Sequence, residues 1–277
     1  HFMKQGLLLV FAFVSGASFA VPIEDKIVGE IHRQLPPTFR PEIGTVGTKP
    51  KTPEASLRAI RVSPGLRVEL VASEPLVIAP VSVNFGPDGK TWVVEMHDYP
   101  LGMRGGYEPG GRIVFLDDTD RDGLPDKRTV FLDGLSFPSG VTAWRKGVLV
   151  CAAPDILYAE DTNGDGRSDK QTVFYQGRDV DSAMGICVLG NRVIVSCSPN
   201  VLVFTDVDGD DKPDRKEILF SRTGQPQHEH SAHSFLLGPD GKMYWNFGNT
   251  GGAVHDYKGQ PIVDLAGHTV VDNGRPY

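Results

Sequence analysis

Cysteine is scarce in this chain, and its few cysteines follow no metal-binding or haem-binding pattern. The sequence contains Cys151, Cys187 and Cys197, and no C-x-x-C or C-x-x-C-H spacing occurs. An odd number leaves at least one thiol unpaired. All three lie in alternating apolar runs, which favours small buried hydrophobic side chains. A Cys187–Cys197 bridge across a hairpin is the alternative.

Positive charge and long apolar runs are also lacking. Lys and Arg number 28 against 35 Asp and Glu, for a formal net charge of −7. No basic stripe is present to neutralise phosphates, which argues against a nucleic-acid surface. No G-x-G-x-x-G follows a strand pattern, so a nicotinamide site of the Rossmann type is not indicated. The apolar run LLLVFAFV (residues 7–14) is too short to span a bilayer.

That apolar run lies in an N-terminal segment that predicts export. Lys4 gives a positive n-region, and Ser18 and Ala20 occupy the small positions of a cleavage site. We therefore interpret residues 1–20 as a secretory signal peptide, which places the mature chain in the periplasm or outside the cell without a transmembrane helix. Residues 21–60 read as a Pro-rich lead-in arm that ends in a short helix, PEASLRAI.

The most informative feature that is present is an internal repeat of roughly 44 residues. It is seen in GRIVFLDDTDRDGLPDKRTVFLDGL, ILYAEDTNGDGRSDKQTVFYQG and VLVFTDVDGDDKPDRKEILFSR. Two more short strand patterns stand between successive runs, and some of these pairs are joined by a G-P-D-G-K turn, which suits a tight hairpin. No segment shows a sustained helical period. Four short strands per repeat predict an all-β protein, a β-propeller with four-stranded blades.

The repeat also sets the expected domain organisation. Residues 61–277 would form an incomplete β-propeller of about three and a half blades, whereas a closed ring needs ~4–8 blades. The chain therefore reads as the N-terminal part of a longer protein, and the strand RVELVAS (67–73) is expected to help complete the closing blade. The expected blades span about 78–135, 136–178, 179–223 and 224–277.

Each repeat carries an acidic loop of the pattern D-x-[DN]-x-D-[GD]-x-x-D. Oxygen ligands at alternating positions converge when the chain curls, and Gly at the sixth position permits the sharp turn. An all-oxygen shell suits a structural Ca²⁺, although Asp, Asn and Gly are also simply good turn formers. The third loop has Asp211 in place of that Gly, which weakens the expectation there. The candidate ligands are Asp118, Asp120, Asp122 and Asp126, then Asp161, Asn163, Asp165 and Asp169, then Asp206, Asp208, Asp210 and Asp214.

Three histidines, His228, His230 and His233, stand just before a further strand pattern, in HEHSAHSFLLGPDGK. By the blade boundaries this segment leads into a first strand, which lines the central channel of a propeller, where ligand sites gather. Three interpretations stay open at this point. His230 is a general base, the three histidines bind a transition metal, or they are polar loop residues without chemistry.

Two families resemble this sequence. The pattern H-x7-G-P-D-G-K-φ-Y, followed closely by G-[DN], resembles the soluble PQQ-dependent glucose/sorbosone dehydrogenases, which are six-bladed propellers. Residues 53–250 are more similar to the exported proteins of planctomycetes and verrucomicrobia that are known as membrane-bound dehydrogenases or PVC-type haem-binding proteins. PEASLRAIRVSPGLRVELVASEPLVIAPV, WVVEMHDYPLG and YAEDTNGDGRSDK carry this second resemblance. Full-length members continue into helical repeats and a C-x-x-C-H cytochrome-like domain, neither of which is in this sequence.

The resemblance implies an oxidoreductase that oxidises a sugar or alcohol, uses PQQ as the cofactor and passes electrons to a downstream haem domain or cytochrome-like partner. It makes His230 the general base and places Glu95 and His233 at the cofactor-binding site. Asn249 stands where the dehydrogenases have an Asp that supports the histidine. An amide orients an imidazole but does not stabilise the imidazolium as a carboxylate does. The alternative function is therefore a non-catalytic, calcium-stabilised propeller that binds glycans or proteins or acts as a scaffold.

Overall fold

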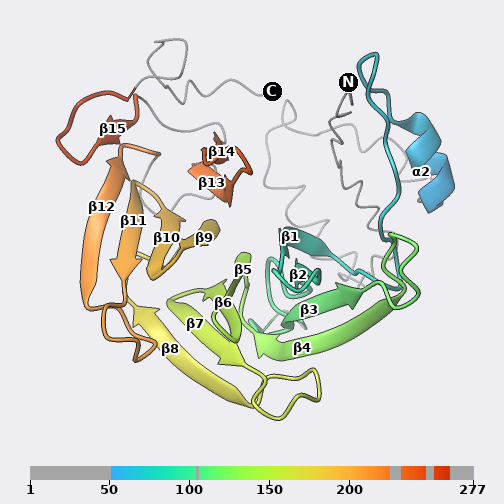
Figure 1. Ribbon diagram of the computed structural model, residues 1–277, viewed down its shortest axis with the longest axis horizontal. Coiled ribbons are helices and arrows are strands. Elements are labelled where there is room, and N and C mark those ends of the chain that lie inside the picture. Colours follow the sequence, from blue (N-terminus) through green and yellow to red (C-terminus); the bar gives the residue numbers. More distant parts are fainter. Residues whose placement is uncertain (1–50, 104–105, 225–231, 248–252, 263–277) are drawn as a thin grey trace, which may run out of the picture. The chain divides into compact units, whose positions relative to one another are not determined.

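The computed structural model is drawn in Figure 1, and it describes residues 51–103, 106–224, 232–247 and 253–262. The predicted signal peptide and most of the lead-in arm lie outside the described residues. The chain divides into two compact units, residues 1–78 and 79–277.

The described part of the first unit contains the expected short helix, α2 (Pro53–Ala59). The side chain of Thr52 caps its first turn by accepting a hydrogen bond from the amide of Ala55 at 3.2 Å. Glu54 in the first turn and Arg58 in the last turn complement the helix dipole. The prediction of this helix is confirmed.

The prediction of a strand at residues 67–73 is wrong, because the structure contains no strand there. Side-chain burial does alternate, since Val68 and Leu70 are half-buried while Arg67 and Glu69 are exposed and form an ion pair with each other. A strand also requires a hydrogen-bonded neighbour. No described strand pairs with this segment, so the alternation alone does not produce a ladder.

The second unit is built from antiparallel sheets whose strands follow chain order. Sheet A contains β1 (Pro80–Phe85), β2 (Thr91–Glu95), β3 (Gly111–Asp117) and β4 (Lys127–Leu135). Sheet B contains β5 (Gly140–Trp144), β6 (Gly147–Ala152), β7 (Asp155–Glu160) and β8 (Lys170–Gln176). Sheet C contains β9 (Gly185–Leu189), β10 (Arg192–Cys197), β11 (Asn200–Thr205) and β12 (Arg215–Ser221). Sheet D, as far as it is described, contains β13 (Ala232–Leu237) and β14 (Met243–Phe247).

The first strands β1, β5, β9 and β13 contact one another in sequence, and the last strands β4, β8 and β12 lie on the outside (Figure 1). This is the arrangement of propeller blades. The predicted all-β fold with four-stranded blades is confirmed. The short strand β15 (His255–Asp256) comes from the range expected for the fourth blade but pairs with the outer edge of β12, so sheet C has five strands.

The core lies between the faces of successive sheets. Trp92 packs against Phe115 and Phe131 at ring-centroid distances of 5.1 and 4.9 Å, and this cluster also contains Val148 and Val150 of sheet B. A second cluster joins sheets B and C in the same way. The central strands are consequently buried on both faces, which explains the nearly continuous apolar runs of β6 and β10.

Each sheet has two ends with different loops. One end carries the β1–β2, β5–β6 and β9–β10 turns together with the three acidic loops, and we call it the aspartate-loop end. The opposite end, called the connector end, carries the β2–β3, β6–β7 and β10–β11 connections and the links between sheets. Neighbouring sheets share these ends. The Trp144 indole donates to the Gly190 carbonyl at the first end, and the Ser139 hydroxyl donates to the Ala183 carbonyl at the second.

Candidate functional site

Glu95 ends β2 at the connector end, and its side chain has no exposed surface. One carboxylate oxygen accepts a hydrogen bond from Nη2 of Arg128 at 2.6 Å, and the same oxygen lies 3.2 Å from Nε2 of His97. The side chains of Arg128 and His97 are 19% and 16% exposed. A carboxylate with no exposed surface acts on a ligand through its partners, so Arg128 and His97 are the groups that can reach solvent here.

Asp98, which the sequence patterns did not single out, is also fully buried at this end. Its Oδ2 accepts hydrogen bonds from the amides of Gly110 and Phe137 at 3.3 and 2.9 Å. These bonds tie the β2–β3 connection to the link between sheets A and B. Its Oδ1 has no hydrogen-bond partner. A single Asp in a loop carries no distinctive sequence signal, which is why pattern reasoning passed over it.

His233 is the second residue of β13, which begins at the connector end. It faces Asn246 across the ladder, with His233 Nδ1 3.2 Å from Asn246 Oδ1. His230 and Asn249, the predicted base and its orienting amide, lie outside the described residues. Of the predicted catalytic and cofactor group, the structure therefore places Glu95 and His233, and it places both at the connector end.

The three aspartate loops share one hydrogen-bond scheme. In each loop the side chain of the first residue accepts a hydrogen bond from the backbone amide of the sixth residue. The side chain of the third residue accepts from the amide of the fifth, and that of the fifth accepts from the amide of the seventh. The side chain of the ninth residue accepts from the amide of the second, which closes the loop. In the first loop, for example, Asp118 Oδ2 accepts from the Gly123 amide at 2.8 Å. The repeat in sequence is thus a repeat in the hydrogen-bonded conformation of the loop.

Two positions in each loop adopt the left-handed conformation that favours glycine. The fourth and sixth residues have φ of +82° and +87° at Gly164 and Gly166 in the second loop. The first loop places Arg121 at the fourth position with φ +63°, and the third places Asp211 at the sixth with φ +68°. These two non-glycine residues mark where the loops depart from the common pattern.

The structure brings together only part of each predicted ligand set. Asp118, Asp120 and Asp122 offer carboxylate oxygens that lie within 4.8 Å of one another, and so do Asp206, Asp208 and Asp210. The carboxylate of the ninth residue is not part of this cluster. In the first loop, both oxygens of Asp126 accept hydrogen bonds from the amide and hydroxyl of Thr119, at 2.9 and 2.6 Å. The amide and hydroxyl of Thr162 hold Asp169 in the same way.

The electrostatics of the loops follow from these contacts. The hydroxyl and amide of Thr119 lower the pKa of Asp126 below its ordinary value. Asp120 behaves differently. The amide of Asp122 lowers the pKa of Asp120, but the charge of the Asp122 carboxylate and hydrogen bonding with Asp118 raise it, and the net pKa lies above its ordinary value. Crowded carboxylates of this kind fit a divalent cation, which would relieve their repulsion.

The third loop receives a basic side chain from the neighbouring sheet. Arg145, in the β5–β6 turn, donates from Nη2 to Asp206 Oδ2 at 2.9 Å and from Nη1 to Asp211 Oδ1 at 2.5 Å. No ion pair of this kind links the described residues to the carboxylates of the first two loops. Sequence reasoning missed Arg145 because its partners lie about sixty residues away along the chain.

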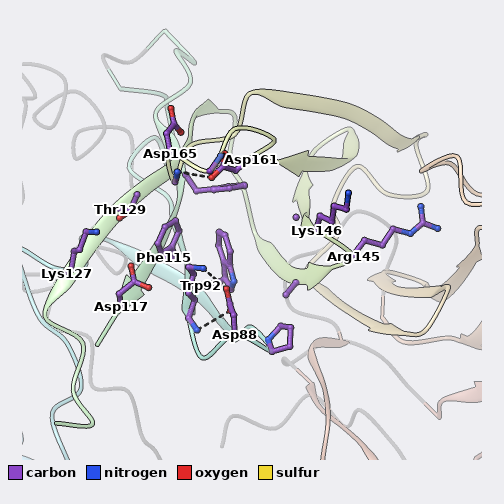
Figure 2. A pocket seen from close by; sticks show the side chains of 17 residues that line it. Asp88, Trp92, Phe115, Asp117, Lys127, Thr129, Arg145, Lys146, Asp161 and Asp165 are labelled. Atoms are coloured by element: carbon purple, nitrogen blue, oxygen red, sulfur yellow. Dashed lines mark hydrogen bonds and ion pairs between the residues drawn. The ribbon is translucent and has the colours of Figure 1, made fainter. Parts of the chain in front are cut away.

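A cavity of about 560 Å³ opens at the aspartate-loop end between sheets A and B. Figure 2 shows Trp92 and Phe115 in its wall, with Lys127 on one side of them and Arg145 on the other. Its size falls within the range of small-molecule sites. Acidic and basic side chains line it in equal number: Asp88, Asp117, Asp161 and Asp165, and Lys90, Lys127, Arg145 and Lys146.

The cysteines are structural. All three are free and buried, which confirms the expectation of small hydrophobic side chains and rules out the Cys187–Cys197 bridge in this structure. Cys187 faces Ile194 across the ladder rather than Cys197. Burial raises the pKa of Cys187 to about 11, so the thiol is protonated at neutral pH.

A family model described as "Domain of unknown function (DUF7133)" matches residues 52–184 and 178–271. The chain belongs to this family. The matches cover the whole of sheets A to C, so the four-stranded repeat and its aspartate loops are features of the DUF7133 part of the chain. No helix among the described residues of this DUF7133 chain is long and apolar enough to cross a membrane.

Two further comparisons accompany the DUF7133 match. Comparison with curated proteins gave no match. Among solved structures, a gluconolactonase from Xanthomonas campestris matches with 17% sequence identity and a TM-score of 0.45. The match covers 66% of this chain and 59% of the gluconolactonase chain, so the DUF7133 chain spans less than two thirds of that protein's length. No activity is carried over from this likeness.

Proposed function

We propose that this chain is the propeller part of an exported PQQ-dependent oxidoreductase that oxidises a sugar or alcohol and passes electrons to a haem domain or cytochrome-like partner. The observation that carries the proposal is that Glu95, which holds His97 and Arg128, ends β2 at the connector end, the end at which His233 also lies in β13. In the sequence, His230 stands two residues before the first residue of β13. The sequence resemblance to the PQQ-dependent glucose/sorbosone dehydrogenases and to the PVC-type proteins supports the choice of chemistry.

The positive charge of Arg128 fits an anionic cofactor such as PQQ. PQQ carries carboxylates, and Arg128 is a partly exposed cation whose Nε lacks a hydrogen-bond partner. Glu95 does not fit a direct contact, because it is buried and negatively charged. In the proposed site Glu95 therefore fixes the position of Arg128 and His97, and Arg128 presents the positive charge.

The proposed reaction assigns proton handling to the chain itself. PQQ, when bound, supplies the acceptor for the hydride of the substrate alcohol. His230 removes the hydroxyl proton as general base, and Asn249 orients its ring by hydrogen bonding. Since an amide does not stabilise the imidazolium, we expect slower turnover than an Asp at position 249 would give.

We also propose that the first two aspartate loops bind structural Ca²⁺. Their support is the convergence of carboxylates in the first loop, the raised pKa of Asp120 and the shared loop conformation. In this proposal Asp118, Asp120 and Asp122, and their counterparts Asp161, Asn163 and Asp165, supply the ligands. Asp126 and Asp169 close the loops through Thr119 and Thr162 instead.

A PQQ titration of the full-length exported protein in Ca²⁺ tests the proposed function. Dye reduction is followed with a panel of sugars and alcohols, and PQQ binding is followed separately by its absorbance. We expect saturable PQQ-dependent turnover, which His230→Ala lowers by ~10²–10⁴-fold without abolishing PQQ binding. The matched control is His228→Ala, two residues away, which should retain turnover. Absence of PQQ binding, or equal activity in both variants, would overturn the proposal.

The cavity between sheets A and B favours a second candidate, a calcium-stabilised module that binds glycans. Its balanced charges and aromatic wall suit a neutral ligand rich in hydroxyl groups. The two candidate functions can be distinguished because they use different residues. A glycan that binds without PQQ, and whose affinity falls in Lys127→Ala but not in His230→Ala, would favour the binding module over the oxidoreductase.

A further inference from the structure

We infer that the third aspartate loop is closed by Arg145 of the neighbouring sheet in place of a metal ion. This inference rests on the calcium proposal for the other two loops, and it is independent of the PQQ chemistry. It concerns Asp206, Asp208, Asp210 and Asp214, which share the loop pattern of the first two loops but not their surroundings.

The carboxylate at the first position of the third loop is held by two backbone amides and by the Arg145 guanidinium. Asp206 Oδ1 accepts from the Gly209 amide at 2.7 Å, and Oδ2 accepts from the Asp211 amide at 3.1 Å and from Arg145 Nη2 at 2.9 Å. The Asp206 side chain has no exposed surface. A metal ion at this position would have to displace the guanidinium, or lie within a few ångströms of its positive charge.

Further contacts hold the Arg145 side chain in this position. Its Nη1 donates to the Gly209 carbonyl at 3.1 Å as well as to Asp211, and its guanidinium lies 4.1 Å from the ring centroid of Trp144. The planar fork of arginine, with several donors, is suited to holding two carboxylates and a carbonyl at once. Burial lowers the pKa of Arg145, but the hydrogen bonds to Asp211 and Asp206 and the charges of these two aspartates outweigh it, so the pKa lies above its ordinary value.

Both partners of the Arg145–Asp211 ion pair occupy backbone positions that favour glycine. Arg145 has φ +52° and Asp211 has φ +68°. The corresponding sixth positions of the first two loops are Gly123 and Gly166. Left-handed backbone is tolerated at glycine, asparagine and aspartate and is strained at a long side chain such as that of Arg145. The ion pair between two such residues gives a physical reason for this strain, since glycine at either position would remove the contact.

The second loop also faces a turn of a neighbouring sheet, but the cation of that turn is paired within the turn itself. The second loop lines the cavity together with Asp88 of the β1–β2 turn, an acid, and Asp88 is paired with Lys90 of its own turn at 2.5 Å. The β1–β2 turn thus adds no free cation to the second loop, whereas the β5–β6 turn inserts Arg145 into the third. The carboxylates of the third loop converge like those of the first, but among the described residues only the third loop receives a cation from a neighbouring sheet.

Calcium stoichiometry of the full chain, with loops one and two disabled, tests this inference. Asp118→Asn with Asp161→Asn removes the first ligand of both loops, and isothermal titration with CaCl₂ then reports on the third loop alone. We expect no calcium binding in this background. Adding Arg145→Gly and Asp211→Gly removes the cation and restores the common loop sequence, and we expect a calcium site to appear. Lys146→Gln, in the same turn as Arg145, is the control and should add none.

Two results would overturn the inference. One is calcium binding in the background variant that still contains Arg145, and the other is no gain when Arg145 and Asp211 are both replaced in a chain whose circular dichroism matches the parent. A second readout follows Arg145 itself in the Asp118→Asn, Asp161→Asn chain, because Arg145 lines the same cavity as the second loop and calcium bound there would also move its signal. In that chain the Arg145 Nε–H resonance should not shift on addition of CaCl₂, and a saturable shift would also overturn the inference. Failure of PQQ turnover would leave all of these readouts unchanged.

Discussion

Glu95 is the residue whose replacement should matter most for the connector end. Glu95→Gln removes the charge that pairs with Arg128, whose Nε already lacks a hydrogen-bond partner. Removing one member of a buried ion pair leaves the other uncompensated, and we expect a loss of about 3–5 kcal/mol in the free energy of unfolding. Urea denaturation followed by tryptophan fluorescence measures this loss.

The control for that prediction is an exposed ion pair of the same type. Lys242 and Asp240 form a pair in the β13–β14 turn at 2.8 Å, with side chains 51% and 38% exposed. Lys242→Met should change the free energy of unfolding by less than about 1 kcal/mol. Glu95→Gln combined with Arg128→Met should recover part of the loss. Equal effects of Glu95→Gln and Lys242→Met would contradict a structural role for the buried pair.

Between elements, sheets B and C are joined by a small network on their outer strands. Asp179, in the β8–β9 link, accepts from Lys216 Nζ of β12 at 2.6 Å and from the Tyr175 hydroxyl of β8 at 3.0 Å. Burial raises the pKa of Asp179, but the bonds from Lys216 and Tyr175 outweigh it, so the pKa lies below its ordinary value. A depressed pKa contributes stability above the ordinary value near 3.9, and this contribution is lost as the pH falls through the folded-state pKa.

Melting temperatures measured between neutral pH and about pH 2 test this sign. Asp179→Asn should lower the melting temperature at neutral pH and should flatten its fall below about pH 4, since one acid-sensitive contact is gone. Glu217→Gln, at an exposed position of β12, should leave the profile unchanged. A steeper acid limb in Asp179→Asn than in the parent would show that the sign is wrong.

Most of the secondary-structure elements could be predicted from the sequence. Alternating apolar runs located the strands of sheets A to C, and the G-P-D-G-K turns marked the β1–β2 and β13–β14 hairpins, because each strand needs only local periodicity and a turn. The strand at 67–73 failed because pairing depends on a neighbour that periodicity does not reveal. The aspartate loops were found from spacing alone. Arg145, Arg128 and Asp98 were missed because their partners are brought together only by the packing of sheets and connections.

At the scale of the whole second unit, the two ends of the sheets are expected to have separate functions. Glu95 and His233 of the proposed cofactor site lie at the connector end, and the proposed calcium loops lie at the aspartate-loop end. Substitutions at one end should therefore leave the property of the other unchanged. Ca²⁺ should raise the melting temperature, because a ligand that binds only the folded chain stabilises it. Asp118→Asn should reduce this rise while PQQ binding in saturating Ca²⁺ is retained.

His230→Ala should show the reverse behaviour, with turnover reduced by ~10²–10⁴-fold and the calcium-dependent rise in melting temperature retained. Both variants are measured by calorimetry with and without EDTA and by PQQ-dependent dye reduction. If His230→Ala removed the calcium effect, or if Asp118→Asn abolished PQQ binding, the two ends would be coupled. The calcium of this protein would then belong to its active site, and the structural role proposed for the aspartate loops would be wrong.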